Sequence, residues 1–282
     1  MINKTFAGID EKYSSIENSK ILLQSFPYDG TSTYGKGADK GFQAFLEASE
    51  NMELYDIETD SEPYKNGIHI VNELKDFNSP VDMFDKTYHR TKELLKLDKF
   101  ITFFGGEHSI SIGIIKAYYE HFENLTVLQI DAHADLRAVY NGSPYNHACA
   151  VYDASKNCNL IQVGIRSMDI SEKENMDFYK VYFADEIKYN KVWFDDSVNQ
   201  MTDDVYITLD LDVLDPSIMP ATGTPEPGGL DWYLLVSYLK KVFEEKNVVG
   251  FDIVELAPIE GISAPQFLAA KLYYKMLSYK FS

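Results

Sequence analysis

Short apolar runs alternate along this chain with longer stretches whose apolar residues recur at helical spacing. The apolar runs are 20–26, 68–71, 100–104, 125–130, 160–163, 181–183, 205–209 and 248–253. The amphipathic stretches include 41–49, 81–97, 110–122 and 232–246, and Asp231 is a candidate cap for the last of them. Strands that are apolar throughout and alternate with helices are typical of a parallel sheet covered on both faces. We therefore predict an α/β fold with about eight parallel strands.

The alternation of strands and helices continues without a break. No linker rich in Ser, Gly or Pro, no repeat and no low-complexity segment interrupts it. A chain of 282 residues is long enough for one large α/β domain or two ordinary ones. We favour a single domain over residues 1–282.

Ionisable side chains follow the predicted strand 125–130. Asp131, His133 and Asp135 alternate with apolar residues there. Residues two apart on an extended backbone point to the same face, so the three side chains can converge if strand geometry continues past the strand end. That arrangement is typical of metal ligands. The alternative for this triplet alone is a solvated loop at the end of a strand.

Two further strand ends carry the same chemistry. His108 follows strand 100–104 after two glycines, and Asp210 and Asp212 end strand 205–209 with two carboxylates on one predicted face. Ligands of parallel sheets bind at the carboxyl ends of the strands. Four carboxylates and two imidazoles exceed what one ion needs, and without a cation their burial would be costly. We therefore predict two divalent ions; the oxygen-rich, sulfur-free set favours manganese, with zinc, nickel or cobalt tolerated.

Four motifs extend this pattern to a known family. GGEHS at 105–109, DAHADLR at 131–137, DLDVLDPSIMPATGTPEPGGL at 210–230 and GFDIVEL at 250–256 resemble the ureohydrolases, the arginases and agmatinases, in family order. The resemblance implies a three-layer α/β/α arginase fold around an eight-stranded parallel sheet, with two manganese ions. It implies two ligand sets that share Asp131 and Asp210: His108, Asp131, Asp135 and Asp210 for one ion, and Asp131, His133, Asp210 and Asp212 for the other.

The resemblance also implies catalytic roles. Two ions sharing a water would supply hydroxide near neutral pH, which can attack a guanidinium carbon. Asp135 is expected to take the water's proton, His147 to pass a proton to the leaving amine, and Glu255 to bind the guanidinium. Without the resemblance, His147 would be interpreted as a surface-loop histidine and Glu255 as a solvated strand-end acid. Arg137 and Arg166 are either structural ion-pair partners or interface residues.

Agmatine is the substrate that the sequence favours. The loop 222–229 resembles the agmatinase version, and the asparagine that arginases carry just after the DAHAD ligands is missing here. Cleavage of agmatine would give putrescine and urea. The alternatives are arginase, guanidinobutyrase or formimidoylglutamase activity, or a catalytically silent family member. Residues 40–43 and 149–152 depart from the family pattern, which leaves the binding of the substrate's far end open.

Charge and composition narrow the partners. The formal net charge of −18 favours a cationic small molecule and argues against nucleic acid or an anionic membrane surface. No uncharged apolar run approaches the roughly 20 residues of a membrane span, and residues 1–6 lack the apolar core of a signal peptide. Two cysteines allow no disulfide framework. We expect a cytoplasmic protein, and the resemblance implies a homo-oligomer, a trimer or hexamer.

Overall fold

A single parallel sheet organises the fold. The computed structural model describes residues 5–282. The expectation about a signal peptide concerned residues 1–6, and most of these lie outside the described residues. Eight strands occur within residues 5–282: β1 (Ile21–Ser25), β2 (Ile68–Ile70), β3 (Phe100–Phe104), β4 (Thr126–Ile130), β5 (Asn159–Ile165), β6 (Val181–Phe183), β7 (Asp204–Asp210) and β8 (Asn247–Val254). Each lies within two residues of a predicted strand at both ends. Their spatial order is β2-β1-β3-β8-β7-β4-β5-β6, and each neighbouring pair is parallel.

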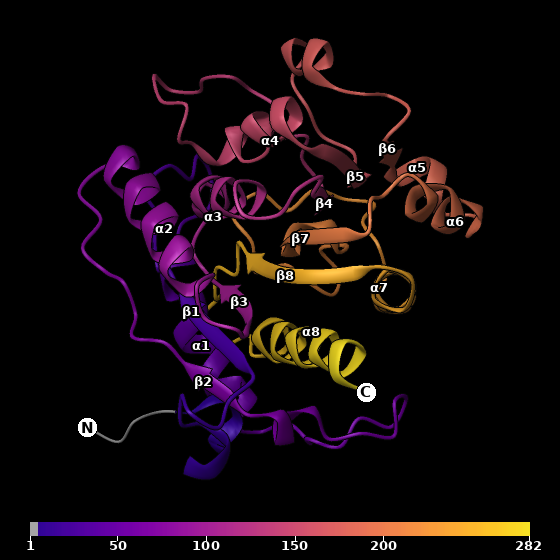
Figure 1. The fold of residues 1–282 in the computed structure, drawn as a ribbon. Coiled ribbons are helices and arrows are strands. Elements are labelled where there is room, and N and C mark those ends of the chain that lie inside the picture. Colours follow the sequence, from indigo (N-terminus) through magenta and orange to yellow (C-terminus); the bar gives the residue numbers. More distant parts are fainter. Residues whose placement is uncertain (1–4) are drawn as a thin grey trace.

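Helices cover both faces of this sheet. They are α1 (Gly41–Ser49), α2 (Pro80–Leu94), α3 (Ile110–Tyr119), α4 (Tyr152–Asn157), α5 (Ala184–Ile187), α6 (Val192–Asn199), α7 (Trp232–Glu245) and α8 (Ala264–Phe281). Short 3-10 turns are η1 (Phe6–Gly8), η2 (Glu11–Tyr13), η3 (Ala38–Lys40), η4 (Pro63–Asn66), η5 (His147–Cys149), η6 (Ile170–Asn175) and η7 (Leu211–Val213). Apolar residues of α1, α6, α7 and α8 pack on one face and those of α2, α3 and α4 on the other (Figure 1). The predicted three-layer α/β/α fold is confirmed.

The helix boundaries follow local capping chemistry where the sequence supplies it. The Asp231 carboxylate accepts a hydrogen bond from the Leu234 amide at 2.9 Å, which confirms it as the cap of α7. Ser79 caps α2 in the same way, and Pro80 occupies the first turn. Helix α8 has no side-chain cap, and it is buried around much of its circumference. A helix without a polar face gives a weak periodic signal, which explains why the pattern did not predict it.

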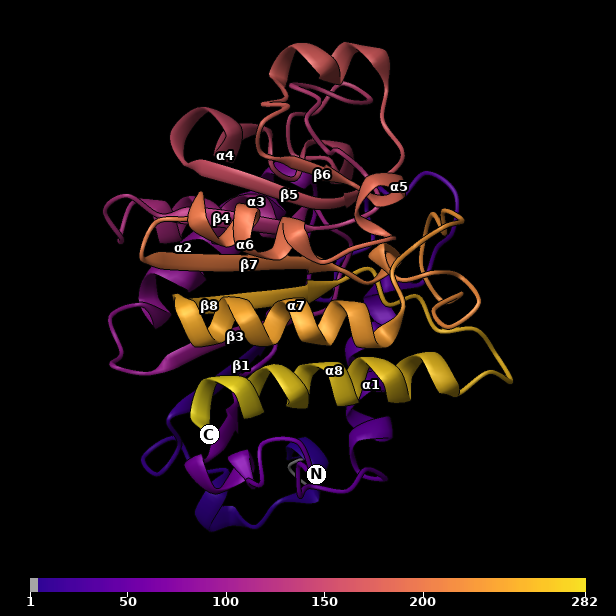
Figure 2. The ribbon, with the colours of Figure 1, turned by 90° about the vertical axis from the view of Figure 1, so that its right-hand side faces the viewer.

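The strand register brings the ends of four strands to the same level. Phe104 of β3 pairs with Ile253 of β8, Ile253 with Leu209 of β7, and Leu209 with Ile130 of β4. The segments that follow these residues therefore leave the sheet side by side. Figure 2 shows the loops after β7 and β8 gathered at one edge of the sheet. Every predicted metal ligand lies at or just beyond this edge.

Two further expectations from the sequence concern membrane spans and disulfides. No helix within residues 5–282 is both long enough and apolar enough to cross a bilayer. Cys149 and Cys158 are both free thiols. The chain is therefore held together by packing of its two apolar clusters against the sheet.

Candidate functional site

The segment after β4 turns sharply and distributes its ligands. The strand ends at Ile130, so continued strand geometry, the condition under which the triplet could converge, is not met. The Asp131 carboxylate accepts the His133 amide at 2.6 Å, and Asp135 has φ of 52°, in the left-handed region. As a result Asp131 and Asp135 face His108, whereas His133 faces Asp212. The three side chains still meet at one site, but a turn rather than a strand brings them there.

The second acidic pair is also arranged by a turn. Strand β7 ends at Asp210 and continues directly into η7. Asp210 Oδ1 accepts the Asp212 amide at 2.8 Å, which leaves Oδ2 to face His108. Asp212 Oδ1 accepts the Ala132 amide at 3.1 Å and so joins this turn to the segment after β4. Each carboxylate keeps one oxygen for the backbone and presents the other to the site.

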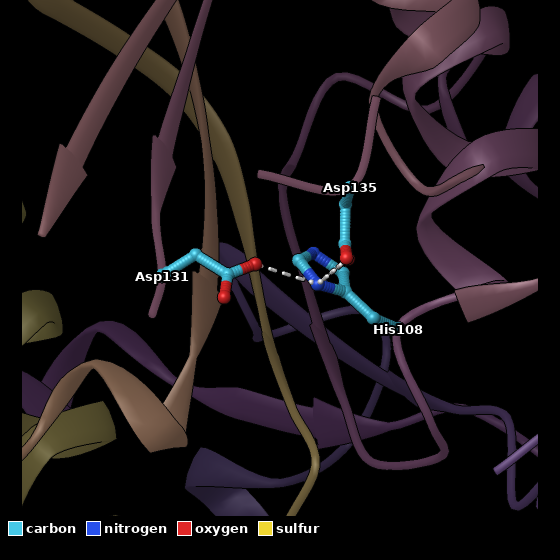
Figure 3. Close-up of side chains that lie close together, drawn as sticks. All are labelled: His108, Asp131 and Asp135. Carbon is cyan, nitrogen blue, oxygen red and sulfur yellow. Dashed lines mark ion pairs between the residues drawn. The ribbon is translucent and has the colours of Figure 1, made fainter. Parts of the chain in front are cut away.

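The His108 ring lies among three carboxylates. Its Nδ1 atom lies 3.0 Å from Asp131 Oδ2, 3.2 Å from Asp135 Oδ2 and 3.4 Å from Asp210 Oδ2. Figure 3 shows Asp131 and Asp135, both from the segment after β4, approaching this nitrogen from two directions. Atoms that each lie about 2.1 Å from one ion and subtend a right angle there are about 3 Å apart. The separations therefore suit ligands of a common cation.

The other ring nitrogen decides the state of His108. The Thr208 hydroxyl donates to Asp252 Oδ1 at 2.7 Å, so at 2.9 Å it accepts from His108 Nε2–H. In the neutral ring Nδ1 then carries a lone pair. That nitrogen is buried and has no hydrogen-bond partner among the described residues. A lone pair facing carboxylate oxygens is stable only when a proton or a metal ion lies between them, and the three carboxylates that supply oxygen ligands make this donor set fit a metal ion.

A second cluster of ligand atoms adjoins the first. Asp131, His133 and Asp212 offer ligand atoms within 4.8 Å of one another, and the same holds for His108, Asp131 and Asp135. His133 Nδ1 lies 2.8 Å from Asp212 Oδ2. Asp131 belongs to both clusters. The structure thus brings all six predicted ligands together: five form two adjoining groups that share Asp131, and the sixth, Asp210, lies beside the first group with its Oδ2 3.4 Å from His108 Nδ1.

The electrostatics of the site favour added positive charge. Burial raises the pKa of Asp210 well above its usual value, and the neighbouring Asp212 and Asp131 carboxylates raise it further. Burial lowers the pKa of His133, but attraction to Asp212 outweighs burial and raises it to about 11. In the absence of metal, protons therefore collect where like charges are crowded. Divalent ions would replace those protons.

A cavity of about 240 Å³ opens over these ligands. Its lining includes Asp135 and the remaining predicted site residues, His147 and Glu255. Glu255 Oε1 accepts the His108 amide at 2.8 Å, so the two motifs are joined directly. Burial, followed by the nearby Glu107 carboxylate, raises the pKa of Glu255 to about 8. A cationic group bound in the cavity would stabilise its ionised form.

Unfavourable backbone conformations occur at the site itself. Asp135 and Glu255 have φ of 52° and 68°, which side-chain-bearing residues seldom adopt. The Glu255 amide donates to the Gly106 carbonyl, which helps to hold this conformation. Gly106 must be glycine, because its φ is 88° and a Cβ there would lie 2.4 Å from the Phe26 carbonyl oxygen. Such strain is common where the surrounding fold fixes a functional side chain.

The two arginines left open by the sequence have different surroundings. Arg166 donates to backbone carbonyls, among them Asp212 at 2.6 Å and Glu226 at 2.8 Å. It therefore fixes the loop 222–229 to the turn that carries Asp212. Its role is structural, and within residues 5–282 it forms no ion pair. Arg137 lies over the Tyr140 ring, with its Nε 3.6 Å from the Glu172 carboxylate, and it lines the cavity.

Two residues around His147 were not predicted. Glu107 is fully buried, and its carboxylate accepts hydrogen bonds from the amide and the hydroxyl of Thr31. The Thr31 hydroxyl in turn contacts His147. The signal for Glu107 was present in the sequence, since an acid directly precedes the ligand His108 in GGEHS. Thr31 lies in a turn far away in sequence, and no local pattern indicates its contact.

Comparison with known proteins agrees with this geometry. A model of the arginase family matches residues 19–278. The N(1)-aminopropylagmatine ureohydrolase of Synechocystis is 33% identical, over 95% of this chain and 92% of that protein, and the agmatinase of Bacillus cereus is 31% identical, over 94% and 93%. The crystal structure of agmatine ureohydrolase of Thermoplasma volcanium superposes with a TM-score of 0.86 at 29% identity, covering 95% of this chain and 92% of that one. With both its length and its fold matched, the chain belongs to the arginase family.

Proposed function

We propose that this protein hydrolyses the guanidinium group of agmatine to urea and putrescine, with two manganese ions as cofactors. The observation that carries the proposal is the buried Nδ1 atom of His108, which has no hydrogen-bond partner among the described residues and faces three carboxylate oxygens below the cavity. The same cavity is lined by Glu255 and His147. A site that demands cations therefore adjoins groups able to bind and protonate an amine-bearing substrate.

The ligand sets proposed for the two ions follow the two clusters. His108, Asp131 and Asp135, with Asp210 beside them, would hold one ion, and Asp131, His133 and Asp212, again with Asp210, the other. Their oxygen and imidazole donors suit manganese and tolerate zinc, nickel or cobalt. When bound, such ions supply Lewis-acid activation of water near neutral pH.

The protein's own groups would orient the substrate and move protons. The Glu255 carboxylate can accept two parallel N–H bonds from the planar guanidinium and so fix its carbon over the ligands. Asp135 would accept the proton that the attacking water loses as the C–O bond forms. His147 would donate a proton to the alkyl nitrogen as its bond to that carbon breaks, which releases urea and an ammonium-bearing product.

The distal end of the substrate is the finer part of the proposal. The agmatinase-like loop 222–229 and the net charge of −18 support a substrate with a second cationic group. N(1)-aminopropylagmatine, a longer polyamine with the same guanidinium, is the second candidate. It is favoured by the relative from Synechocystis, whose name refers to that substrate and whose identity to this chain is 33%.

The test is a comparison of steady-state rates on manganese-loaded protein. Agmatine, N(1)-aminopropylagmatine, arginine, 4-guanidinobutyrate and formimidoylglutamate would be supplied in parallel, and urea would be measured for every substrate except the last, whose formamide would be measured. We expect the highest kcat/KM on agmatine. A higher value on the aminopropyl derivative would select the second candidate, and no urea from either would refute the proposal.

Manganese dependence is tested separately by chelation and metal replacement. Activity should disappear in chelator and return best with manganese. The cytoplasmic location expected from the sequence belongs to the same proposal. So does the trimeric or hexameric assembly that the resemblance implies. Sedimentation at working concentration tests the assembly.

A further inference from the structure

His147 is held from behind by a buried acid that the sequence did not single out. The ring's Nδ1 atom lies 3.2 Å from Thr31 Oγ1 and 3.5 Å from Glu107 Oε2. The His147 backbone amide also donates to Thr31 Oγ1, at 3.0 Å. Glu107 is fully buried, whereas the His147 side chain retains 17% of its exposure and lines the cavity. The ring is thus anchored through Nδ1, with Nε2 left for the cavity.

The donors and acceptors around Glu107 determine which nitrogen of the His147 ring carries the proton. Thr31 has one hydroxyl hydrogen, and it is donated to Glu107 Oε2 at 2.5 Å. The opposite oxygen, Oε1, accepts from the Thr31 amide at 3.1 Å and from the Ser109 hydroxyl at 2.8 Å. Both atoms that face His147 Nδ1, a threonine oxygen without a spare hydrogen and a carboxylate oxygen, can only accept. The neutral ring must therefore carry its proton on Nδ1.

We infer that Glu107 is a positioning residue that fixes the Nδ1–H tautomer of His147 and thereby presents the Nε2 lone pair to the substrate. The inference rests on the proton-transfer role proposed for His147, and it adds how the fold prepares that histidine. The ring can then take up a proton at Nε2 and deliver it at the same atom. Thr31 is the link, because its hydroxyl joins the carboxylate to both the ring and the backbone of His147.

The charge of Glu107 acts in the same direction as its geometry. The charged groups that act on the His147 imidazole are Glu107 behind it and Asp135 and Glu255 across the cavity. Burial lowers the pKa of His147, but its hydrogen bond to Glu107 and the negative charge of these groups outweigh burial and raise it. Of the three acids, Glu107 alone contacts Nδ1. Loss of its charge should therefore make the imidazolium less stable without altering the cavity.

Glu107→Gln tests this with almost no change of shape. An amide has one acceptor oxygen where the carboxylate had two, so the Thr31 hydroxyl is no longer compelled to donate to residue 107. It becomes free to donate to His147 Nδ1, which would favour the opposite tautomer and remove the Nε2 lone pair. We expect kcat to fall about tenfold to a hundredfold, within the range of general acid–base catalysis, while KM and metal content stay within about twofold.

The pH midpoint of the His147 ring can be measured without following turnover. Diethyl pyrocarbonate reacts with neutral imidazole, so its rate at His147, resolved by peptide mass spectrometry on the metal-loaded enzyme, reports the pH midpoint of that ring. In Glu107→Gln the midpoint should move to lower pH. Ser109→Ala is the matched control, because it removes another donor to the same carboxylate and leaves Thr31 and His147 in contact. Its midpoint should equal that of wild type.

A double-mutant cycle separates positioning from general stability. If Glu107 acts through His147, Glu107→Gln should cost less than about twofold in a His147→Ala background. An equal fold-loss in both backgrounds, a midpoint that does not move, or loss of metal would each overturn the inference. Full kcat in His147→Ala would instead overturn the proposed role of His147, while the labelling midpoint would still test the contact. Should Glu107→Gln not fold, Thr31→Val removes the hydroxyl link but keeps the Glu107 charge, so in that variant kcat should fall at unchanged metal content while the labelling midpoint stays near that of wild type. An unchanged kcat in Thr31→Val would overturn the inference.

Discussion

Two histidines of the site, His108 and His147, are held by hydrogen bonds to opposite ring nitrogens. In His108 the Nε2–H group donates to Thr208, while Nδ1 faces carboxylate oxygens and has no hydrogen-bond partner among the described residues. In His147 the Nδ1 atom is held by Thr31 and Glu107, and the cavity receives Nε2. The first arrangement suits a metal ligand, and the second suits the proton transfer proposed for His147.

The difference lies in which ring nitrogen is held, since the same kind of relay stands behind both rings. Behind His108 the relay ends on Asp252, a buried acid that also accepts the Tyr206 hydroxyl at 2.7 Å. Behind His147 it ends on Glu107. In both, a threonine hydroxyl donates to a buried carboxylate and accepts from the imidazole. One device, applied to opposite nitrogens, yields two functions.

The largest effect is expected on the metal side of the comparison. Asp131→Asn should lose both ions and reduce kcat at least about a thousandfold, because the shared carboxylate leaves both clusters and the ions supply several kcal/mol. His133→Asn should mainly weaken one ion. Metal content by mass spectrometry, with kcat on the same samples, checks both, and wild-type metal content in Asp131→Asn would contradict the assignment.

The next effect breaks the proton-transfer side and leaves the metal side intact. His147→Ala should lower kcat about a hundredfold or more, with unchanged metal content, since the ring has no ligand role here. His89→Ala is the control, at an exposed ring that faces the Asp85 carbonyl of its own helix and packs against Tyr88, away from the site. If His147→Ala instead lost metal, the two histidines would not be functionally distinct.

A smaller effect comes from the support of His108. Thr208→Val keeps the shape but removes the acceptor for Nε2–H, so the tautomer with a free Nδ1 lone pair is no longer enforced. Metal affinity should fall about tenfold to a hundredfold, as for other residues that orient metal-bound histidines. Titration of metal-free protein measures it. Unaltered affinity would show that the carboxylates alone define the metal cluster.

The smallest effect is a pH dependence of stability. Burial lowers the pKa of His147, but Glu107 and Asp135 outweigh burial and raise it above the usual 6.5. Because the folded pKa is the higher one, the imidazolium contributes its full stabilisation below about pH 6.5 and loses it as pH rises through the raised value. In metal-free protein, the deficit in unfolding free energy of His147→Gln should therefore be larger at pH 6 than at pH 9. A deficit that grew with pH would reverse the assigned sign.

The sequence predicted the sheet and the ligands because both depend on local patterns. Apolar runs mark buried parallel strands, and ionisable residues directly after them meet wherever parallel strands end together. Asp131, Asp210 and His108 were found in this way, and the register of β3, β8, β7 and β4 explains their meeting. The assumed continuation of β4 failed because the Asp131 carboxylate captures the His133 amide and turns the chain.

Contacts between segments far apart in the sequence could not be predicted from local sequence patterns. Thr31 and Glu107 are 76 residues apart, and Thr31 and His147 are 116 apart, so neither pairing has a local signature. Arg166 was ambiguous because carbonyl acceptors, unlike acidic partners, leave no trace in a sequence. Helix α8 was missed because burial on most sides removes the periodic signal.

The position of β8 has a consequence for how the protein is made. This strand is the last in the chain, yet it lies between β3 and β7, near the middle of the sheet. A nascent chain that lacks residues after 246 can assemble β2-β1-β3 and β7-β4-β5-β6 only as separate fragments. Glu255 and its bond to the His108 amide arise only after β8 inserts. The candidate site therefore assembles only once β8 is in place, so a chain truncated before residue 247 should lack it.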